Sequence, residues 1–234
     1  MIRFLRQFDP HCVRLLVFDL DGTLIDSRLD LVHSVNAMLR HIDRPELDGD
    51  LIASYVGDGA PALVRRALGD TDDEAFFRGA LEYFLGYYSL HKLDHTTVYE
   101  GIPEVLARLA QPSNEMQPNG VQRQMAVLTN KPVNASRGIV QGLGLGDFFV
   151  RVYGGNSFPT KKPDPLGVRT LLQETGVAAD EALIIGDSAI DILTGRNAGL
   201  WTCGVTYGFA PHSLEKVPPD VLVETPRELG ELLR

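Results

Sequence analysis

Residues 19–26 read Asp19-Leu20-Asp21-Gly22-Thr23-Leu24-Ile25-Asp26 and follow directly on the apolar run LLVF at 15–18. The apolar run predicts a buried strand that ends at Asp19, and Asp21-Gly22 is a turn signal. In open α/β sheets, ligands bind beyond the carboxyl ends of the strands, where this stretch would place two carboxylates on one side. The stretch therefore predicts a functional site, although a polar turn between a strand and a helix would look similar.

The residues after this stretch predict a helical insertion and then a series of strands and helices. Apolar residues recur every three or four positions throughout 28–96, most regularly over 77–88, which is typical of amphipathic helices. Strands are then expected at 124–128, 149–153, 182–185, 201–205 and 221–223, and helices at 132–142, 163–175 and 188–198. The polar residues 111–122 predict a surface loop.

Strands that alternate with helices predict a parallel sheet covered on both faces. We therefore expect an α/β fold with a Rossmann-like, doubly wound parallel sheet core, built from residues 1–27 and 98–234. Residues 28–97 would form an all-helical domain inserted into this core.

The composition is that of an ordinary globular protein and limits the classes of partner. The 234-residue chain has a net charge of -9, which disfavours broad nucleic-acid binding because such binding needs a basic face. No apolar stretch is long enough for a membrane span or a signal peptide, and Cys12 and Cys203 lack the spacing of a zinc site. We expect a cytoplasmic monomer or homodimer that binds neither nucleic acid nor membrane.

Three further groups of residues could carry chemistry. Thr129-Asn130-Lys131 follows an expected strand, and its hydroxyl and backbone N–H groups suit a phosphate oxygen, although Thr and Asn also cap helices. The Lys161-Lys162 pair could neutralise a phosphoryl group or lie solvated before a turn. Asp187 ends another apolar strand and Asp191 follows one helical turn later, a pair of hard oxygen ligands that suits Mg²⁺.

Each of these groups has a structural explanation when it is taken alone. Parallel strands, however, bring their carboxyl ends to one edge of the sheet, so Asp19, Thr129 and Asp187 would meet there. The coincidence of all four groups at one edge indicates a site for phosphoryl chemistry.

Together these motifs resemble the haloacid dehalogenase superfamily. The match consists of D-x-D-G-T-L-x-D at 19–26, T-N at 129–130, K-P-D-P at 162–165 and G-D-S-x-x-D at 186–191. Within the superfamily the chain is most similar to the bacterial phosphoglycolate phosphatases, with additional support from residues 55–60 and 205–209. The helical insertion looks like the mobile cap domain of that superfamily.

The resemblance implies a role for each residue of the core motifs. Asp19 would attack phosphorus and form an aspartyl phosphate, and Asp21 would act as the general acid and base. Thr129 and the backbone N–H groups near Leu20, Asp21 and Asn130 would hold the phosphoryl oxygens. Lys162 would bind the phosphate and neutralise its charge.

The resemblance also implies a magnesium site. Mg²⁺ would be held by Asp19, by the backbone carbonyl of Asp21 and by Asp187, with Asp191 and Ser188 around these ligands. Asp191 would orient Lys162 or a metal-bound water. An anionic nucleophile that approaches a phosphate needs such neutralisation.

The expected activity is hydrolysis of a small phosphorylated metabolite, with 2-phosphoglycolate the best single candidate. Asp21 favours phosphoryl transfer over dehalogenation, because a halide leaves without a proton. A sugar phosphomutase of the β-phosphoglucomutase kind, a pyrophosphatase and a nucleotidase stay open as alternatives. A phospho-receiver signalling domain is disfavoured, because its phosphorylated Asp lies on a later strand than Asp19.

Substrate choice is expected to depend on the cap. Gly57-Asp58-Gly59 could reach down over the site, or could simply be a turn between two helices. We expect the hinges of the cap near residues 26–28 and 97–101.

Overall fold

The computed structural model of the chain describes residues 1–111 and 123–234, and its main body is a seven-stranded sheet in the order β1-β9-β8-β7-β2-β5-β6. The strands are β1 (Arg3–Phe4), β2 (Leu15–Phe18), β5 (Gln124–Leu128), β6 (Arg151–Tyr153), β7 (Ala182–Gly186), β8 (Trp201–Val205) and β9 (Val221–Val223). All neighbouring pairs are parallel except β1, which pairs antiparallel with β9. Strand β2 lies between β7 and β5, so the motif at 19–26 begins at the carboxyl end of an interior strand.

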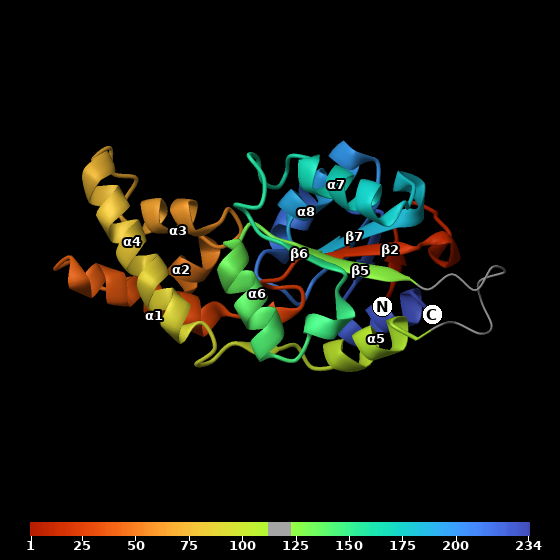
Figure 1. Cartoon of the computed structure of the whole chain (residues 1–234), viewed down its shortest axis with the longest axis horizontal. Coiled ribbons are helices and arrows are strands. Elements are labelled where there is room, and N and C mark those ends of the chain that lie inside the picture. Colours follow the sequence, from red (N-terminus) through yellow and green to blue (C-terminus); the bar gives the residue numbers. More distant parts are fainter. Residues whose placement is uncertain (112–122) are drawn as a thin grey trace.

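The sheet is parallel and buried because its central strands are apolar on both faces. In β2, Leu15 and Val17 belong to one apolar cluster, whereas Leu16 and Phe18 belong to another on the opposite face. Figure 1 shows α7 (Leu166–Thr175) and α8 (Ala189–Ala198) over one face, and α5 (Ile102–Leu109) and α6 (Val133–Gly142) over the other. The last helix, α9 (Pro226–Leu232), packs against α5. The predicted α/β fold with a parallel core and a helical insertion is confirmed.

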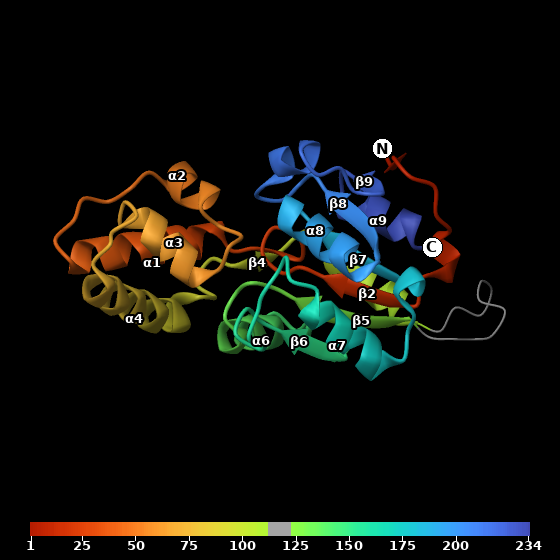
Figure 2. The same cartoon turned by 90° about the horizontal axis from the view of Figure 1, so that it is seen from above.

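Four helices form a separate layer to one side of the sheet, as Figures 1 and 2 show. These helices, called the cap helices below, are α1 (Arg28–His41), α2 (Gly49–Ser54), α3 (Ala60–Ala67) and α4 (Glu74–His91). The long helix α4 packs against both α1 and α3. The apolar stripe at 77–88 faces these contacts through Phe77, Ala80 and Phe84, which are buried. The exact domain boundaries, 27/28 and 97/98, stay a prediction.

The two connections between the cap helices and the sheet pair with each other. Strands β3 (Ile25–Asp26) and β4 (Thr97–Val98) form a two-stranded antiparallel ladder. Beside it, the buried carboxylate of Asp30 accepts hydrogen bonds from the backbone N–H groups of His95 and Thr96 and from the Thr96 hydroxyl. These contacts tie the start of α1 to the segment that returns from α4, near the residues where hinges are expected.

One expected strand begins later than predicted, and one expected loop lies mostly outside the described residues. The strand expected at 149–153 begins only at Arg151, because Gly146–Phe148 forms a 3-10 turn that Phe149 closes by donating to Gly146. All but the first residue of the expected surface loop at 111–122 lie outside the described residues.

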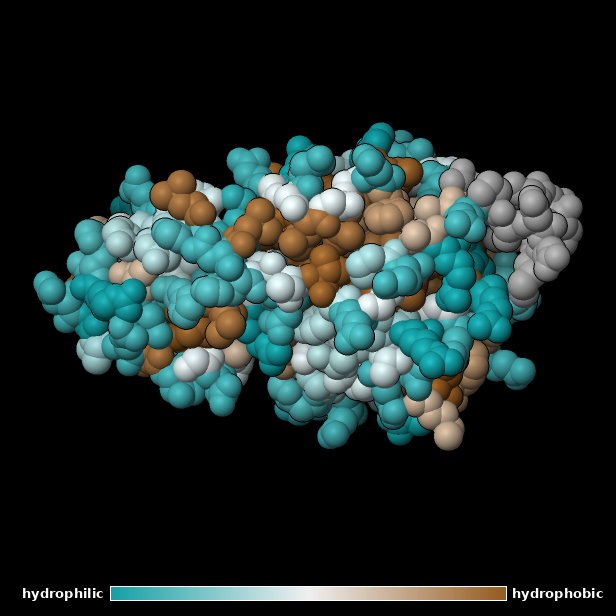
Figure 3. Space-filling view, turned by 90° about the horizontal axis from the view of Figure 1, so that it is seen from below, coloured by the Kyte–Doolittle hydropathy of each residue, from teal (hydrophilic) through white to brown (hydrophobic). Residues whose placement is uncertain are grey.

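On the face seen in Figure 3, hydrophilic residues predominate, and the largest of the hydrophobic areas lies near the centre. None of the helices in residues 1–111 and 123–234 combines the length and the apolar character that a membrane span requires.

Candidate active site

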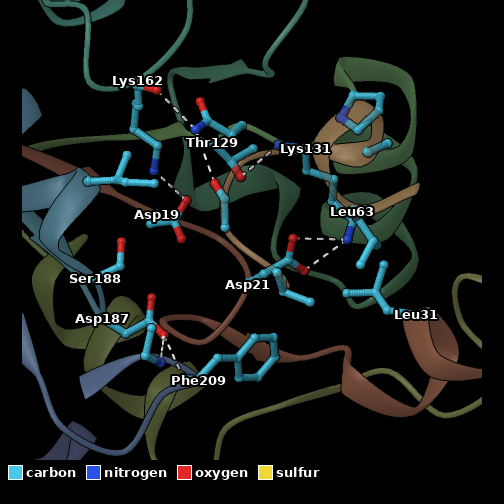
Figure 4. A pocket seen from close by; sticks show the side chains of 18 of the residues that line it. Asp19, Asp21, Leu31, Leu63, Thr129, Lys131, Lys162, Asp187, Ser188 and Phe209 are labelled. Atoms are coloured by element: carbon cyan, nitrogen blue, oxygen red, sulfur yellow. Dashed lines mark hydrogen bonds and ion pairs between the residues drawn. The ribbon is translucent and has the colours of Figure 1, made fainter. Parts of the chain in front are cut away.

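The strand register brings three motif residues to the same edge of the sheet. Phe18 at the end of β2 lies opposite Val127 of β5 and Ile185 of β7. Asp19, Thr129 and Asp187 therefore follow the ends of three adjacent strands, and Figure 4 shows their side chains around a common space. Asp19 is also held by its own backbone, because its N–H donates to the Ile185 carbonyl over 2.9 Å.

Lys162 connects two of the acids. Its Nζ lies 2.6 Å from Asp19 Oδ1 and 2.6 Å from Asp191 Oδ1, and all three residues are buried. The other oxygen of Asp191 accepts hydrogen bonds from the backbone N–H and the hydroxyl of Ser188. Burial alone would lower the pKa of Lys162, but the two carboxylates raise it overall above its ordinary value. Lys162 therefore stays charged beside Asp19.

The acids at this edge carry more negative charge than Lys162 neutralises. Burial raises the pKa of Asp187 to about 8, and the charges of Asp191 and Asp19 add to this effect. Burial also raises the pKa of Asp19 to about 6 although Lys162 opposes the shift. Raised carboxylate pKa values at a strand edge indicate a place where an additional cation would be stabilised.

The donor set fits a hard divalent cation. Oxygens of Asp19, Asp187 and Asp191 all lie within 4.8 Å of one another. Both oxygens of Asp191 are occupied, whereas Asp19 Oδ2 and Asp187 Oδ1 accept no hydrogen bond from the described residues. Asp187 is fixed through its other oxygen by the N–H groups of Phe209 and Ala210. Two carboxylate oxygens thus remain free for a hard divalent cation.

Gly22 is required for this arrangement. Its φ is +81°, and a Cβ at this position would lie 2.3 Å from Asp187 Oδ2. Any other residue would both strain the backbone and displace a candidate metal ligand.

The expected phosphate-binding backbone groups are free. The N–H groups of Leu20, Asp21 and Asn130 donate to no acceptor within the described part of the chain. The Leu20 side chain is fully buried, so this residue offers only its backbone to the site. Thr129 lies beside them and its hydroxyl oxygen accepts the Lys131 N–H over 3.2 Å, which leaves the hydroxyl proton for a ligand. Unpaired N–H groups next to a hydroxyl form a suitable anion cradle.

Asp21 has a cationic partner that the sequence interpretation did not assign. Lys131 Nζ lies 2.9 and 3.0 Å from the two oxygens of Asp21, and the Ser27 hydroxyl donates to Asp21 Oδ1 over 2.5 Å. Burial alone would lower the pKa of Lys131, but the carboxylate of Asp21 raises it overall. The sequence shows Lys131 beside Thr129-Asn130, but nothing in the pattern indicates that it turns toward Asp21.

The loop at residues 57–59 reaches the core, as one of the two interpretations predicts. Asn130 donates from Nδ2 to the Gly57 carbonyl over 3.1 Å, and a Cβ on Gly59 would lie 2.7 Å from the Asn130 carbonyl oxygen. The Asp58 carboxylate instead pairs with Arg66 within the cap, 2.5 Å away. Gly57 and Gly59 therefore line the site, whereas the Asp58 side chain points away from it.

The space between the cap helices and the sheet edge is a cavity of about 60 Å³. Its cap side is largely apolar and consists of Leu31, Val56, Gly57, Gly59, Ala60, Leu63, Phe84, Leu85 and Tyr88. Of the described residues that line it, only Lys131 and Lys162 are cationic. The cavity is therefore lined by charged side chains on the sheet side and by mainly apolar side chains on the cap side.

Comparison with known proteins agrees with this geometry. The family described as "Haloacid dehalogenase-like hydrolase" matches residues 16–205. A protein of Chromobacterium violaceum named phosphoglycolate phosphatase is 36% identical over 227 residues, which is 95% of this chain and 97% of that protein. One of the same name from Pseudomonas savastanoi pv. phaseolicola is 38% identical over 215 residues, 89% of this chain and 75% of that protein.

A solved structure shows the same fold. The crystal structure of a predicted phosphoglycolate phosphatase from Haemophilus somnus 129PT superposes with a TM-score of 0.85 at 27% sequence identity, and the match covers 95% of this chain and 99% of that one. The family match covers most of the chain, and its range includes all four motifs. The chain therefore belongs to the haloacid dehalogenase-like hydrolase family.

Proposed function

We propose that the chain is a Mg²⁺-dependent phosphomonoesterase that hydrolyses a small phosphorylated metabolite, with 2-phosphoglycolate the best single candidate. The family and the named relatives make the chain a phosphatase. The observation that carries the finer proposal is the position of Asp19, which contacts Lys162 through one oxygen and leaves the other free beside three unpaired backbone N–H groups.

In the proposed first half-reaction, Asp19 attacks phosphorus and the bond from phosphorus to the ester oxygen breaks. Asp21 gives its proton to the departing alkoxide, and Ser27 and Lys131 hold its carboxyl group in place. Thr129, Lys162 and the free N–H groups bind the phosphoryl oxygens where negative charge gathers.

In the second half-reaction, water attacks the phosphorus of the aspartyl phosphate. Asp21 takes a proton from this water, the bond from phosphorus to Asp19 breaks, and inorganic phosphate leaves. Mg²⁺ held by Asp19, Asp187 and the Asp21 carbonyl would supply the positive charge that allows an anionic nucleophile to approach a phosphate.

The site allows a direct test. Purified protein with Mg²⁺ should release inorganic phosphate from 2-phosphoglycolate, and a chelator in excess should abolish the release. Stoichiometric free phosphate counts against a phosphomutase, which would return the phosphoryl group to a sugar. Pyrophosphate and nucleotides in the same panel test the other two alternatives. Absence of release from every monoester would refute the proposal.

We also propose a cytoplasmic location and action without a nucleic-acid or membrane partner. The absence of a membrane-spanning helix from the described residues supports this location, as do the free thiols of Cys12 and Cys203. Whether the chain is a monomer or a homodimer stays a prediction.

A further inference from the structure

The proposed reaction gives Lys131 no direct contact with the substrate. Its ammonium group has three N–H donors, and the Asp21 oxygens are its hydrogen-bond acceptors among the described residues. Its side chain is almost fully buried and lines the cavity. Lys162 lies between Asp19 and Asp191, and the proposed reaction already assigns it to the phosphoryl group. Lys131 is therefore placed to hold a second negative charge of a substrate.

Tyr88 adds a second unpartnered group at the same place. Its hydroxyl is buried and finds no hydrogen-bond partner among the described residues, and its ring lies 4.7 Å from Lys131 Nζ. Burial raises the pKa of Tyr88 to about 12, so the hydroxyl keeps its proton and can donate. A buried donor without an acceptor indicates that an acceptor arrives with a ligand.

The position of Lys131 limits where that acceptor lies on the substrate. Asp21 must contact the ester oxygen of the leaving group, and Lys131 Nζ is within 3.0 Å of Asp21. An anionic group only two bonds beyond the ester oxygen would therefore fall beside Lys131. The apolar side chains of Leu31 and Leu63 lie near Lys131 in Figure 4, and they offer such a group no polar contact of their own.

We propose that Lys131 and the Tyr88 hydroxyl form a carboxylate-recognition site, which selects phosphate esters whose short leaving group carries a carboxylate close to the ester oxygen. This inference rests on the proposed phosphatase function and assigns its selectivity to two residues. The apolar cap wall contributes by excluding water and by disfavouring leaving groups that need many hydrogen bonds. Lys131 would keep its contact with Asp21 and add one to the substrate.

The test compares two esters of equal length. 2-Phosphoglycolate carries the carboxylate, and 2-hydroxyethyl phosphate replaces it with a neutral group. The preference is the ratio of their kcat/KM values. Lys131→Met, which keeps the length of the side chain and removes its charge, should lower the preference by roughly tenfold to a hundredfold. Tyr88→Phe, which removes only the hydroxyl, should lower it by a smaller factor of roughly three to ten.

The matched control is Lys216→Met. Lys216 is exposed and does not line the cavity, so its replacement should leave the preference unchanged. Thermal unfolding of each variant shows whether it is folded, and Tyr88→Phe decides the question if Lys131→Met is not.

Four outcomes would overturn the inference. Equal losses on both esters in Lys131→Met would mean that Lys131 acts only through Asp21. An unchanged preference in both variants would mean that neither Lys131 nor the Tyr88 hydroxyl binds the carboxylate. A wild-type enzyme that hydrolyses both esters without preference would refute the recognition site but keep the phosphatase function, whereas hydrolysis of neither ester would refute both.

Discussion

The sheet edge and the cap helices line the same cavity, but the first contributes mainly charged side chains and the second mainly apolar ones. The sheet edge places buried charges in contact, with Lys162 between Asp19 and Asp191 and Lys131 on Asp21. The cap side offers mostly apolar side chains and the two glycines of the 57–59 loop. The difference suggests that the reaction depends on the sheet edge, whereas the cap controls which substrate fits. Substitutions of the acids at the sheet edge should therefore lower kcat for every substrate, whereas substitutions in the cap should change the preference between substrates.

Among the changes that compare the two regions, the largest effect is expected at Asp21. Asp21→Asn removes the proposed general acid and base without changing the shape of the side chain. We expect kcat to fall by roughly 10²–10⁴-fold for every ester that the enzyme hydrolyses, because proton transfer is common to all of them. Steady-state kinetics on several esters would check this. A loss confined to one substrate would show that Asp21 serves recognition, and the division between the two regions would fail.

A moderate effect is expected at the joint between the two regions. Asp30→Ala leaves the buried Thr96 N–H and hydroxyl without their acceptor, so it should lower the free energy of unfolding by about 1–3 kcal/mol. Denaturant unfolding measures this change. Asp94→Ala is the matched control, because the Asp94 carboxylate is exposed and, within the described part of the chain, pairs only with His91 at the surface. Equal losses in the two variants would show that Asp30 does not tie the cap to the sheet.

A third expected effect is a dependence of stability on pH in the absence of metal. The pKa values of Asp19, about 6, and Asp187, about 8, lie above the ordinary value of 3.8. The folded chain then holds protons that the unfolded chain releases, so the folded state loses stability as pH rises from about 4 to about 8. Thermal unfolding in a chelator should show this decrease.

Mg²⁺ should reverse that trend, because it binds the deprotonated acids and its stabilising effect grows as pH rises through this range. Asp187→Asn provides the control, since an amide cannot titrate and should remove most of the decrease between about pH 6 and 8. Stability in the chelator that rises over this range in the wild type would contradict the charge balance described for the sheet edge.

The sequence predicts the sheet edge well because its signals are local. Asp19, Thr129 and Asp187 each follow an apolar run, and parallel strands must bring such ends together. The contact of Lys131 with Asp21 spans 110 residues, and that of Asp30 with Thr96 spans 66. No periodicity encodes such contacts, so the sequence alone could not predict them.

The sequence pattern also did not predict the short paired strands β3 and β4. Each has only two residues, too few for an alternating pattern, and they form because the start and the end of the cap insertion must leave the sheet side by side. The 57–59 loop left two interpretations open, because its glycines allow either a simple turn or an approach to the core.

The proposed reaction requires Asp19 to become phosphorylated during turnover. Enzyme mixed with labelled substrate and Mg²⁺, quenched with acid and digested, can be searched by mass spectrometry for the phosphorylated residue. We expect a phosphoryl group on Asp19 in the wild type and none in Asp19→Asn, together with a loss of kcat of roughly 10⁴-fold or more in that variant. Label on a different residue, or near-normal turnover by Asp19→Asn, would refute the role of Asp19 as nucleophile.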